Sequence, residues 1–363
     1  MEKVIRRKAA RIKQSVEEVV DAVESEDERN EIDLTGPIDR SMLIPTGSTL
    51  LNLALSDDPY GGFALGTINN IVGDSGSGKS FLFWTMLAEM TYDERFNEHE
   101  LIYDEPEAAF AFNTSKLFGK AVEDRVVIDT VSDSVESWHD NVFDKAKEGC
   151  PFIYGLDSLD AISSEEEIER DIRKGTFGAA KPKLIGEILR KIVQKVKGQK
   201  SAVFVISQTR DAIGVMFGDK KTRSGGKALK FFSSHELWMA IKSHIKRKEL
   251  DVGVHVRVKV SKNKITGKLR IVEFPIYYDY GVDDITSCIN FLTDEGHWAV
   301  TKNVVNTKGE ITKELMKTEA LASFIADAEH PDRYKKLVEI TAKEWRKIED
   351  SISTKLPPKY KGD

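Results

Sequence analysis

The chain has 363 residues, of which 40% are hydrophobic, so it can form one large domain with appendages or two domains. Lysine and arginine total 54 against 60 aspartate and glutamate, and the formal net charge of -6 means that any nucleic-acid site must be a local basic surface. The two cysteines and seven histidines show no disulfide or metal-site spacing, so a reducing cytoplasm is the default. The N-terminus is charged and no long apolar run occurs, which predicts neither a signal peptide nor a membrane span.

Residues 1–38 predict an N-terminal helical segment. Apolar residues recur there at helical spacing, which favours an amphipathic helix over Glu2–Glu24; they are Val4, Ile5, Ala9, Ile12, Val16 and Val19. The charged run Ser25–Asp33 is typical of a solvated linker. Such a helix could dock on a neighbouring subunit and support oligomerisation, or it could pack on its own domain. The pattern leaves both open.

The segment Gly73–Ser80 fits the phosphate-loop pattern G-x-x-x-x-G-K-[ST]. The β-prone run Thr67–Val72 precedes it and the helical run Phe81–Met90 follows it, which is the context that the motif requires. Glycines let backbone N–H groups turn around phosphate oxygens at the positive end of a helix. Lys79 is expected to reach the β- and γ-phosphates, and the Ser80 hydroxyl to bind Mg²⁺. The nucleotide-binding candidates are Gly73, Asp74, Ser75, Gly76, Ser77, Gly78, Lys79 and Ser80.

Strands and helices alternate after this loop, which predicts a parallel α/β sheet. The expected elements are strands at Leu101–Asp104, Val126–Ile128, Phe152–Leu156 and Ala202–Ile206, and helices at Ser134–Lys147 and Pro182–Val196. The pattern then changes to strands that should extend the sheet with hairpins, at Leu237–Ile241, Val254–Ser261 and Leu269–Tyr277. A small C-terminal unit, about 291–363, should contain helices near Lys317–Ala328 and Pro331–Ser351.

Polar residues follow three of the predicted strands, and ligands of open α/β sheets bind at the carboxyl ends of strands. Asp157 is placed to hold the Mg²⁺ shell through water ligands; a capping aspartate is the alternative. A carboxylate in Asp104–Glu107 could orient or deprotonate the water that attacks the γ-phosphate, or the run could be a plain acidic loop. Gln208 could sense the γ-phosphate, or it could be a surface amide.

Two basic loops are candidates for a nucleic-acid surface. Thr209–Gly226 mixes basic and apolar residues with several glycines, and basic groups neutralise phosphates while apolar side chains can wedge between bases. The alternative is a flexible surface loop, although a loop of this length is more often functional. Glu169–Lys183 is a second basic loop, which by itself would be interpreted as a solvated face.

The stretch Ile206–Phe232 closely resembles the second DNA-binding loop of bacterial RecA recombinases. The phosphate loop, the pair Asp157-Ser158 and the stretch Val258–Ile265 follow in the order of that family, and the similarity runs from about Asp39 to Leu292. The resemblance implies an α/β fold with a RecA-like P-loop ATPase core at 39–290, a mostly parallel central sheet, an N-terminal helical segment and a small C-terminal domain at 291–363. It also implies ATP and Mg²⁺ as cofactors.

The same resemblance assigns roles to residues at matching positions. Gln208 matches the family's ATP-sensing glutamine, while Lys262 and Lys264 match two lysines that reach the neighbouring subunit's ATP. Without the family, those lysines would be the solvent face of a strand. The positions that fall in or beside the two DNA loops are Arg170, Lys174, Phe177, Gly178, Arg190, Arg210, Ile213, Met216, Phe217, Arg223, Gly225, Gly226 and Lys227.

The sequence departs from the family pattern at the acidic strand end. The family has the form Asp-x-Glu, but here Asp104-Glu105-Pro106-Glu107 has one residue inserted. We take Glu107 as the catalytic carboxylate, with Glu105 as runner-up. Thr114 stands where the family has a tyrosine that stacks on adenine, so base contacts are expected from elsewhere, with Tyr278 of a neighbour as the candidate. The divergence suits a phage-encoded or otherwise distant relative.

The resemblance therefore implies a DNA-dependent ATPase that forms a homo-oligomeric helical filament on single-stranded DNA. It would pair that strand with homologous duplex DNA and promote strand exchange in recombination and repair. Two alternatives stay open: an accessory or regulatory paralogue without strand exchange, and a ring-forming helicase motor on the same core. The apolar Thr209–Gly226 loop and the lysine pair favour the recombinase over the motor.

Overall fold

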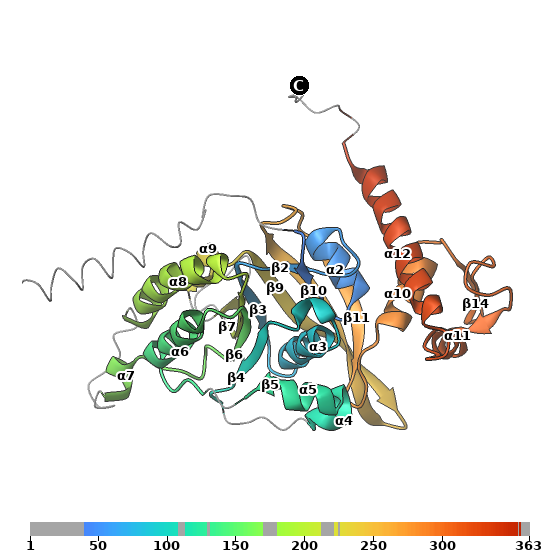
Figure 1. The fold of residues 1–363 in the computed structure, drawn as a ribbon. Helices are drawn as coiled ribbons and strands as arrows, with labels where there is room; N and C mark the ends of the chain where they lie inside the picture. Colours follow the sequence, from blue (N-terminus) through green and yellow to red (C-terminus); the bar gives the residue numbers. More distant parts are fainter. Residues whose placement is uncertain are drawn as a thin grey trace, which may run out of the picture. The chain divides into compact units, whose positions relative to one another are not determined.

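The computed structural model describes residues 40–107, 113–128, 131–169, 180–211, 221–223, 226–354 and 356, shown in Figure 1. The elements up to the last strand of the large sheet are β1 Leu43–Ile44, α2 Thr49–Ser56, β2 Phe63–Ala64, β3 Thr67–Gly73, α3 Lys79–Thr91, η1 Glu94–Phe96, β4 Glu100–Asp104, α4 Thr114–Phe118, α5 Lys120–Arg125, β5 Val126–Val127, α6 Val135–Glu148, β6 Phe152–Asp157, α7 Glu165–Glu169, α8 Ala180–Gly198, β7 Ala202–Asp211, β8 Lys221–Arg223, α9 Gly226–Phe232, β9 His235–Arg247, β10 Leu250–Asn263, β11 Ile271–Tyr277 and β12 Gly281–Val282.

The central sheet has the strand order β12-β11-β10-β9-β3-β7-β6-β4-β5, with β8 paired to β7 off this path. The six strands from β9 to β5 run parallel to their neighbours, and β10, β11, β12 and β8 are antiparallel. Parallel neighbours need crossovers, which the intervening helices supply. The predicted fold class, an α/β core with a mostly parallel central sheet, is confirmed.

Helices cover both faces of the parallel part, as the alternation of side chains requires. Along β6, Phe152, Tyr154 and Leu156 pack with α6 and α8 on one face, while Ile153 packs with α3 on the other. Figure 1 shows α6 and α8 on the side of the sheet away from α3. Because both faces are covered, these strands are buried along their length and hold their carboxyl ends in fixed positions.

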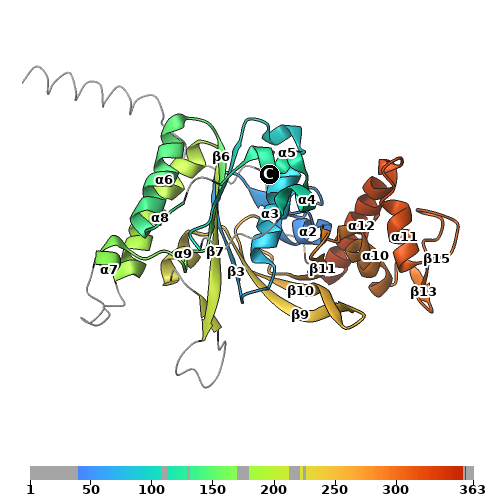
Figure 2. The same cartoon turned by 90° about the horizontal axis from the view of Figure 1, so that it is seen from below.

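Three strands are longer than their apolar runs predict. The expected strand Ala202–Ile206 continues as β7 to Asp211, past Gln208, and its last residues pair with β8, as Thr209 does with Arg223. Figure 2 shows β7 projecting past its neighbours. The hairpin β9–β10 likewise extends to Arg247 and Leu250. The sequence pattern did not predict these extensions, because the added residues are largely polar and show no apolar alternation. Backbone hydrogen bonds between strands can continue beyond the buried part of a strand.

The C-terminal part contains two of the helices that the sequence predicts and a small sheet that it does not. Its elements are α10 Asp284–Asp294, β13 Ala299–Thr301, β14 Val304–Asn306, β15 Met316–Lys317, α11 Thr318–Ile325 and α12 Pro331–Ile352. An apolar cluster of its own includes Cys288 and Leu292 of α10, Leu321 of α11 and Leu337 of α12. The predicted boundary at 291 stays a prediction, and α10, which crosses it, contributes to this cluster.

A buried arginine fastens α12 to the core. The Arg270 guanidinium forms ion pairs with Asp57, at 2.5 Å, and with Glu349 of α12, at 2.7 Å, and it also donates to the Leu53 carbonyl oxygen at 2.9 Å. It lies over the Trp345 ring, 5.4 Å from the ring centroid. This buried charge therefore joins α2, α12 and the residue before β11.

Some predictions lie outside the described residues. They are the helix Glu2–Glu24, the linker Ser25–Asp33 and, in the loops, Arg170, Lys174, Phe177, Gly178, Ile213, Met216, Phe217 and Gly225. Among the helices that are described, none is both long and apolar enough to cross a membrane.

Candidate nucleotide site

The loop between β3 and α3 has the backbone of a phosphate cradle. Gly76 and Gly78 adopt positive φ angles of 74° and 87°, which favour glycine, and α3 begins immediately afterwards at Lys79. A Cβ atom added at Gly73 would lie 2.5 Å from the Ser77 hydroxyl oxygen, so a larger residue would not fit there. The Ser77 hydroxyl is buried and has no protein partner among the described residues. The loop leads directly into the N-terminus of α3, where anions are favoured.

Lys79 is drawn into the loop from the first turn of α3. Its side chain is buried, and its ammonium donates to the Asp74 carbonyl oxygen at 2.8 Å. Burial lowers the pKa of Lys79, and the negative charges of Asp157 and Glu107 oppose that shift. The carboxylates near Lys79 thus oppose the effect of burial on its ammonium group.

Asp157 lies at the carboxyl end of β6 and is 7% exposed. It accepts a hydrogen bond from the Tyr103 hydroxyl at 2.8 Å. Burial raises the pKa of Asp157, while hydrogen bonds from Ser80 and Tyr103 and the charge of Lys79 lower it. A cation beside this carboxylate would favour its charged form.

The pair Ser80 and Asp157 fits the donor set of magnesium, because Mg²⁺ takes oxygen ligands and keeps several waters. No group of three or more histidine, cysteine, aspartate or glutamate side chains suited to a metal occurs in the described part of the chain. A divalent cation here would therefore take its remaining ligands from water and from the phosphates of a nucleotide.

Glu107 reaches the same site from the loop after β4. Its carboxylate accepts hydrogen bonds from the Ser158 hydroxyl, at 2.6 Å, and from the Gln208 side-chain amide, at 3.2 Å. The backbone N–H of Gln208 donates to the Asp160 carboxylate at 2.7 Å. Residues of β7 and residues that follow β4 and β6 thus meet beside Lys79, as the strand-end argument predicts.

The other acids of the run after β4 have different surroundings. Asp104 is fully buried and accepts from the Ser132 backbone N–H, at 2.8 Å, and from the Ser132 and Tyr154 hydroxyls. This carboxylate is committed to holding a neighbouring loop. Glu105 is half-buried, and the donors Ser158 and Gln208 are directed to Glu107 rather than to Glu105. The extra residue at Pro106 therefore leaves Glu107 in the position that contacts the rest of the site.

Sequence reasoning assigned no role at the nucleotide site to four of its contributors: Tyr103, Ser158, Asp160 and Thr209. The Thr209 hydroxyl donates to the Asp74 carboxylate, which ties β7 to the phosphate loop. Ser158 and Thr209 each follow a singled-out strand-end residue, so adjacency could have identified them. Nothing in the pattern marked Tyr103, because it is a buried aromatic inside a strand.

Lys262 and Lys264 lie at the other end of the sheet. Lys262 pairs in register with Glu236, which pairs with Asn70 in the first half of β3, whereas the phosphate loop follows Gly73. The Lys262 ammonium donates to the Phe231 carbonyl oxygen at 2.9 Å and to the Lys230 carbonyl oxygen, at the end of α9. Lys264 is exposed. Neither lysine is placed beside the phosphate loop of its own chain.

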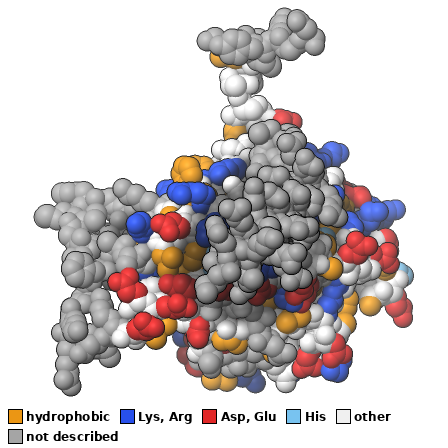
Figure 3. Space-filling view, turned by 60° about the vertical axis from the view of Figure 1, so that its left-hand side comes forward, with side chains coloured by type: hydrophobic (Ala, Val, Ile, Leu, Met, Phe, Trp, Pro, Cys, Tyr) orange, Lys and Arg blue, Asp and Glu red, His pale blue; other side chains and the backbone are white. Residues whose placement is uncertain are grey.

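Tyr278 and five of the candidate DNA-binding residues lie in the described part of the chain. Tyr278 follows β11 and is exposed, as is Arg190 on α8. The backbones of Arg210 and Arg223 belong to β7 and β8, and those of Gly226 and Lys227 to α9. Lysine and arginine side chains are interspersed with acids over the described surface seen in Figure 3.

A family model of the RecA N-terminal domain matches residues 19–283, which include the whole nucleotide site. Protein RecA of Herpetosiphon aurantiacus is 33% identical over 266 residues, which cover 70% of this chain and 70% of that protein. Protein RecA of Caldanaerobacter subterraneus subsp. tengcongensis is 31% identical over 284 residues, or 76% and 80%. Protein RecA of Thermus thermophilus is 30% identical over 287 residues, or 78% and 82%. The chain belongs to the RecA family.

Proposed function

We propose that this protein is a DNA-dependent ATPase that forms a helical filament on single-stranded DNA and promotes homologous pairing and strand exchange. Family membership supports an ATPase with a recombinase-like role. The observation that carries the finer proposal is the contact between Glu107 and Gln208. It joins the carboxylate at the nucleotide site to the strand that leads into the Thr209–Gly226 loop.

The loop Gly73–Ser80 would hold the phosphates of ATP, with Lys79 as the charged contact and Ser80 and Asp157 as partners of Mg²⁺. Bound Mg²⁺ would supply charge neutralisation at the phosphates. The protein's own part is to hold these groups in place before ATP arrives, since preorganised charges cost no rearrangement during the reaction.

Glu107 would position the attacking water and accept its proton. Ser158 and Gln208 donate to this carboxylate, so they fix its direction. Because Gln208 contacts Glu107, a shift of β7 on DNA binding would change the setting of the catalytic carboxylate. ATP and DNA would then each favour the same filament state, which is thermodynamic linkage.

Lys262 and Lys264 would act on the ATP of the neighbouring subunit. Their place at the end of the sheet away from their own phosphate loop supports an action in trans. A cation brought to the γ-phosphate across an interface makes hydrolysis depend on assembly. Tyr278 of a neighbour remains the candidate for the adenine contact.

The test is a strand-exchange assay with ATP between circular single-stranded DNA and homologous linear duplex. We expect joint molecules and exchanged product with ATP, and none with ADP. ATP turnover without any exchange product would contradict the recombinase and support the accessory paralogue. Electron microscopy of the same mixtures separates the second alternative, because rings in place of filaments would identify the helicase motor.

A further inference from the structure

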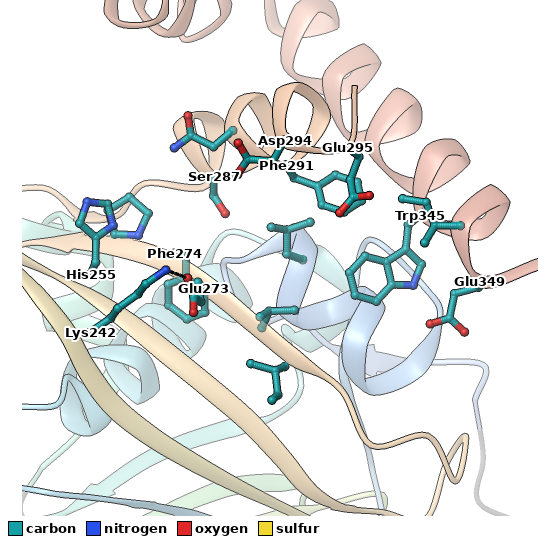
Figure 4. Close-up of a pocket in the computed structure, with 16 residues that line it drawn as sticks. Lys242, His255, Glu273, Phe274, Ser287, Phe291, Asp294, Glu295, Trp345 and Glu349 are labelled. Atoms are coloured by element: carbon teal, nitrogen blue, oxygen red, sulfur yellow. Dashed lines mark hydrogen bonds and ion pairs between the residues drawn. The ribbon is translucent and has the colours of Figure 1, made fainter. Parts of the chain in front are cut away.

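A cavity of about 590 Å³ lies between the edge of the central sheet and the C-terminal helices. Its walls come from β11, from α10 and from α12, and Figure 4 shows their side chains facing a common space. Phe274, Phe291 and Trp345 supply aromatic surface, and the rings of Phe291 and Trp345 lie 5.8 Å apart. The cavity is separate from the nucleotide site, since it shares no lining residue with the phosphate loop.

The cavity runs along an open strand edge. All five residues from Ile271 to Pro275 line it, although successive side chains of a strand point to opposite faces. β12 pairs with β11 only at Ile276 and Tyr277. The Asp283 N–H bonds the Pro275 carbonyl oxygen on this side, so the alternation of an antiparallel ladder directs the backbone groups of Ile271 and Glu273 to the open edge.

Two buried polar atoms in the wall have no partner among the described residues: the Ser287 hydroxyl oxygen and the Trp345 indole nitrogen. Ser287 is 3% exposed and faces the strand from α10 in Figure 4. A buried donor without an acceptor destabilises the fold unless something supplies one.

The rim of the cavity is acidic. Glu273 is paired with Lys242, and Glu349 with Arg270. Asp294, the last residue of α10, and Glu295, which follows it, are exposed and have no ion-pair partner in the described part of the chain. We call Phe274, Phe291 and Trp345 the aromatic floor of the cavity. An occupant with an aromatic group between positive charges would complement both this floor and the acidic rim.

We propose that the cavity binds the C-terminal segment Pro357–Lys361 of the same chain, with Tyr360 on the aromatic floor. This segment has Lys359 and Lys361 on either side of Tyr360, and Pro357-Pro358 favours an extended backbone. α12 ends at Ile352, one turn beyond Glu349 in the cavity wall. Leu356, the last described residue, is exposed and stands four residues before Tyr360, a stretch that can span about 13 Å when extended.

Photo-crosslinking in the full chain tests this assignment. With p-benzoylphenylalanine in place of Tyr360, we expect crosslinks to residues 271–275, 287–295 or 345–349 of the same chain. Their yield should stay constant over a roughly 10-fold dilution, because a tethered segment has a fixed effective concentration. Crosslinks mainly to other surfaces, or to a second copy of the chain, would overturn the proposal.

Charge reversal provides the matched control. Asp294→Lys together with Glu295→Lys should lower the crosslink yield at least about 5-fold, because both rim charges then repel Lys359 and Lys361. Glu314→Lys, an exposed acid away from the cavity, should leave the yield unchanged. An equal yield in the double reversal and the wild type would overturn the charge argument.

Amide hydrogen exchange measures directly whether the edge of β11 is covered. In the full chain carrying Tyr360→Ala, we expect the Ile271 and Glu273 amides to exchange about 10-fold faster than in the wild type, since the tail no longer covers them. Amides in β6, far from the cavity, serve as the reference. Equal exchange of Ile271 and Glu273 in both proteins would show that the tail does not lie on this edge.

Discussion

The two ends of the strands around β3 differ in how complete they are. At the carboxyl end, Lys79, Asp157 and Glu107 lie within one network that three strands and one helix hold in place. At the other end, Lys262 donates to backbone carbonyl oxygens at the end of α9, and Lys264 is exposed. One end has the parts of a nucleotide site, while the other presents two lysines near the surface.

The difference indicates how assembly could control hydrolysis. A buried lysine such as Lys79 is fixed by its own fold and is present in every subunit. A lysine at the opposite end can meet a phosphate only when another subunit brings one. If Lys262 and Lys264 of one subunit complete the nucleotide site of its neighbour, an isolated subunit should bind ATP but hydrolyse it slowly.

Lys262→Ala breaks the proposed trans contact, and we expect the largest effect here. DNA-stimulated ATP turnover should fall by roughly 10³-fold, in the range known for cations supplied in trans. ATP-dependent filament assembly, followed by light scattering, should be lost, while nucleotide binding by the isolated subunit remains. Lys343→Ala, at an exposed position on α12, is the matched control. Unchanged assembly in Lys262→Ala would contradict the trans contact.

Glu107→Gln tests the carboxyl end. The amide keeps an oxygen that can accept from Ser158 and Gln208 but cannot take a proton, so turnover should fall by roughly 10²-fold or more. Filaments with ATP should persist in electron micrographs. Glu105→Gln serves as the control and should keep most of its turnover. The reverse result in steady-state kinetics would transfer the role to Glu105.

Gln208→Ala tests the connection between the nucleotide site and the DNA loop. We expect the ratio of turnover with and without single-stranded DNA to fall by about 10-fold, a coupling loss of about 1.4 kcal/mol. Gln194→Ala on the exposed face of α8 should leave this ratio intact. If Gln208→Ala retains the full ratio, the signal does not pass through this amide.

Glu349→Gln changes a residue outside the nucleotide site and outside the region of Lys262 and Lys264. We expect it to alter only the stability of the fold. The hydrogen bond from Arg270 lowers the pKa of Glu349 below its usual value of 4.5. Its stabilising contribution, about 1–2 kcal/mol, is therefore present at neutral pH and is lost as the pH falls through the lowered pKa.

Urea unfolding of wild type and Glu349→Gln should show this difference at neutral pH and a smaller one at acidic pH, because protonation removes the charge of the carboxylate. Glu339→Gln, at an exposed position on the same helix, is the control. ATP turnover at neutral pH should not change. A difference that grew as the pH fell would contradict the ion pair.

The sequence alone was sufficient for the parts of the fold that local pattern determines. β3, the phosphate loop and α3 could be predicted because glycine spacing and apolar runs mark them directly. The strands β13 to β15 could not, because they have two or three mostly exposed residues and therefore no periodicity. The extension of β7 to Asp211 depends on pairing with β8, which is a contact between distant residues.

The sequence predicted which strand ends form the site, but it did not predict the contacts between their residues. The motif marked Lys79 and Ser80, and the ends of buried strands marked Asp157 and Gln208. The choice between Glu105 and Glu107 depended on the resemblance, since both acids follow the same strand. Hydrogen bonds to Ser158 and Gln208 support Glu107, and such bonds depend on how three strands meet in space.

Mixing two inactive variants tests the central claim of a shared site most directly. Lys79→Met lacks one side of the site and Lys262→Ala the other, so each should be inactive alone. If the site forms between subunits and the two variants co-assemble, as light scattering can check, equal mixtures on single-stranded DNA should recover up to about one quarter of wild-type ATP turnover, because that share of random head-to-tail interfaces pairs two intact sides. A mixture as inactive as its separate components would contradict the shared site.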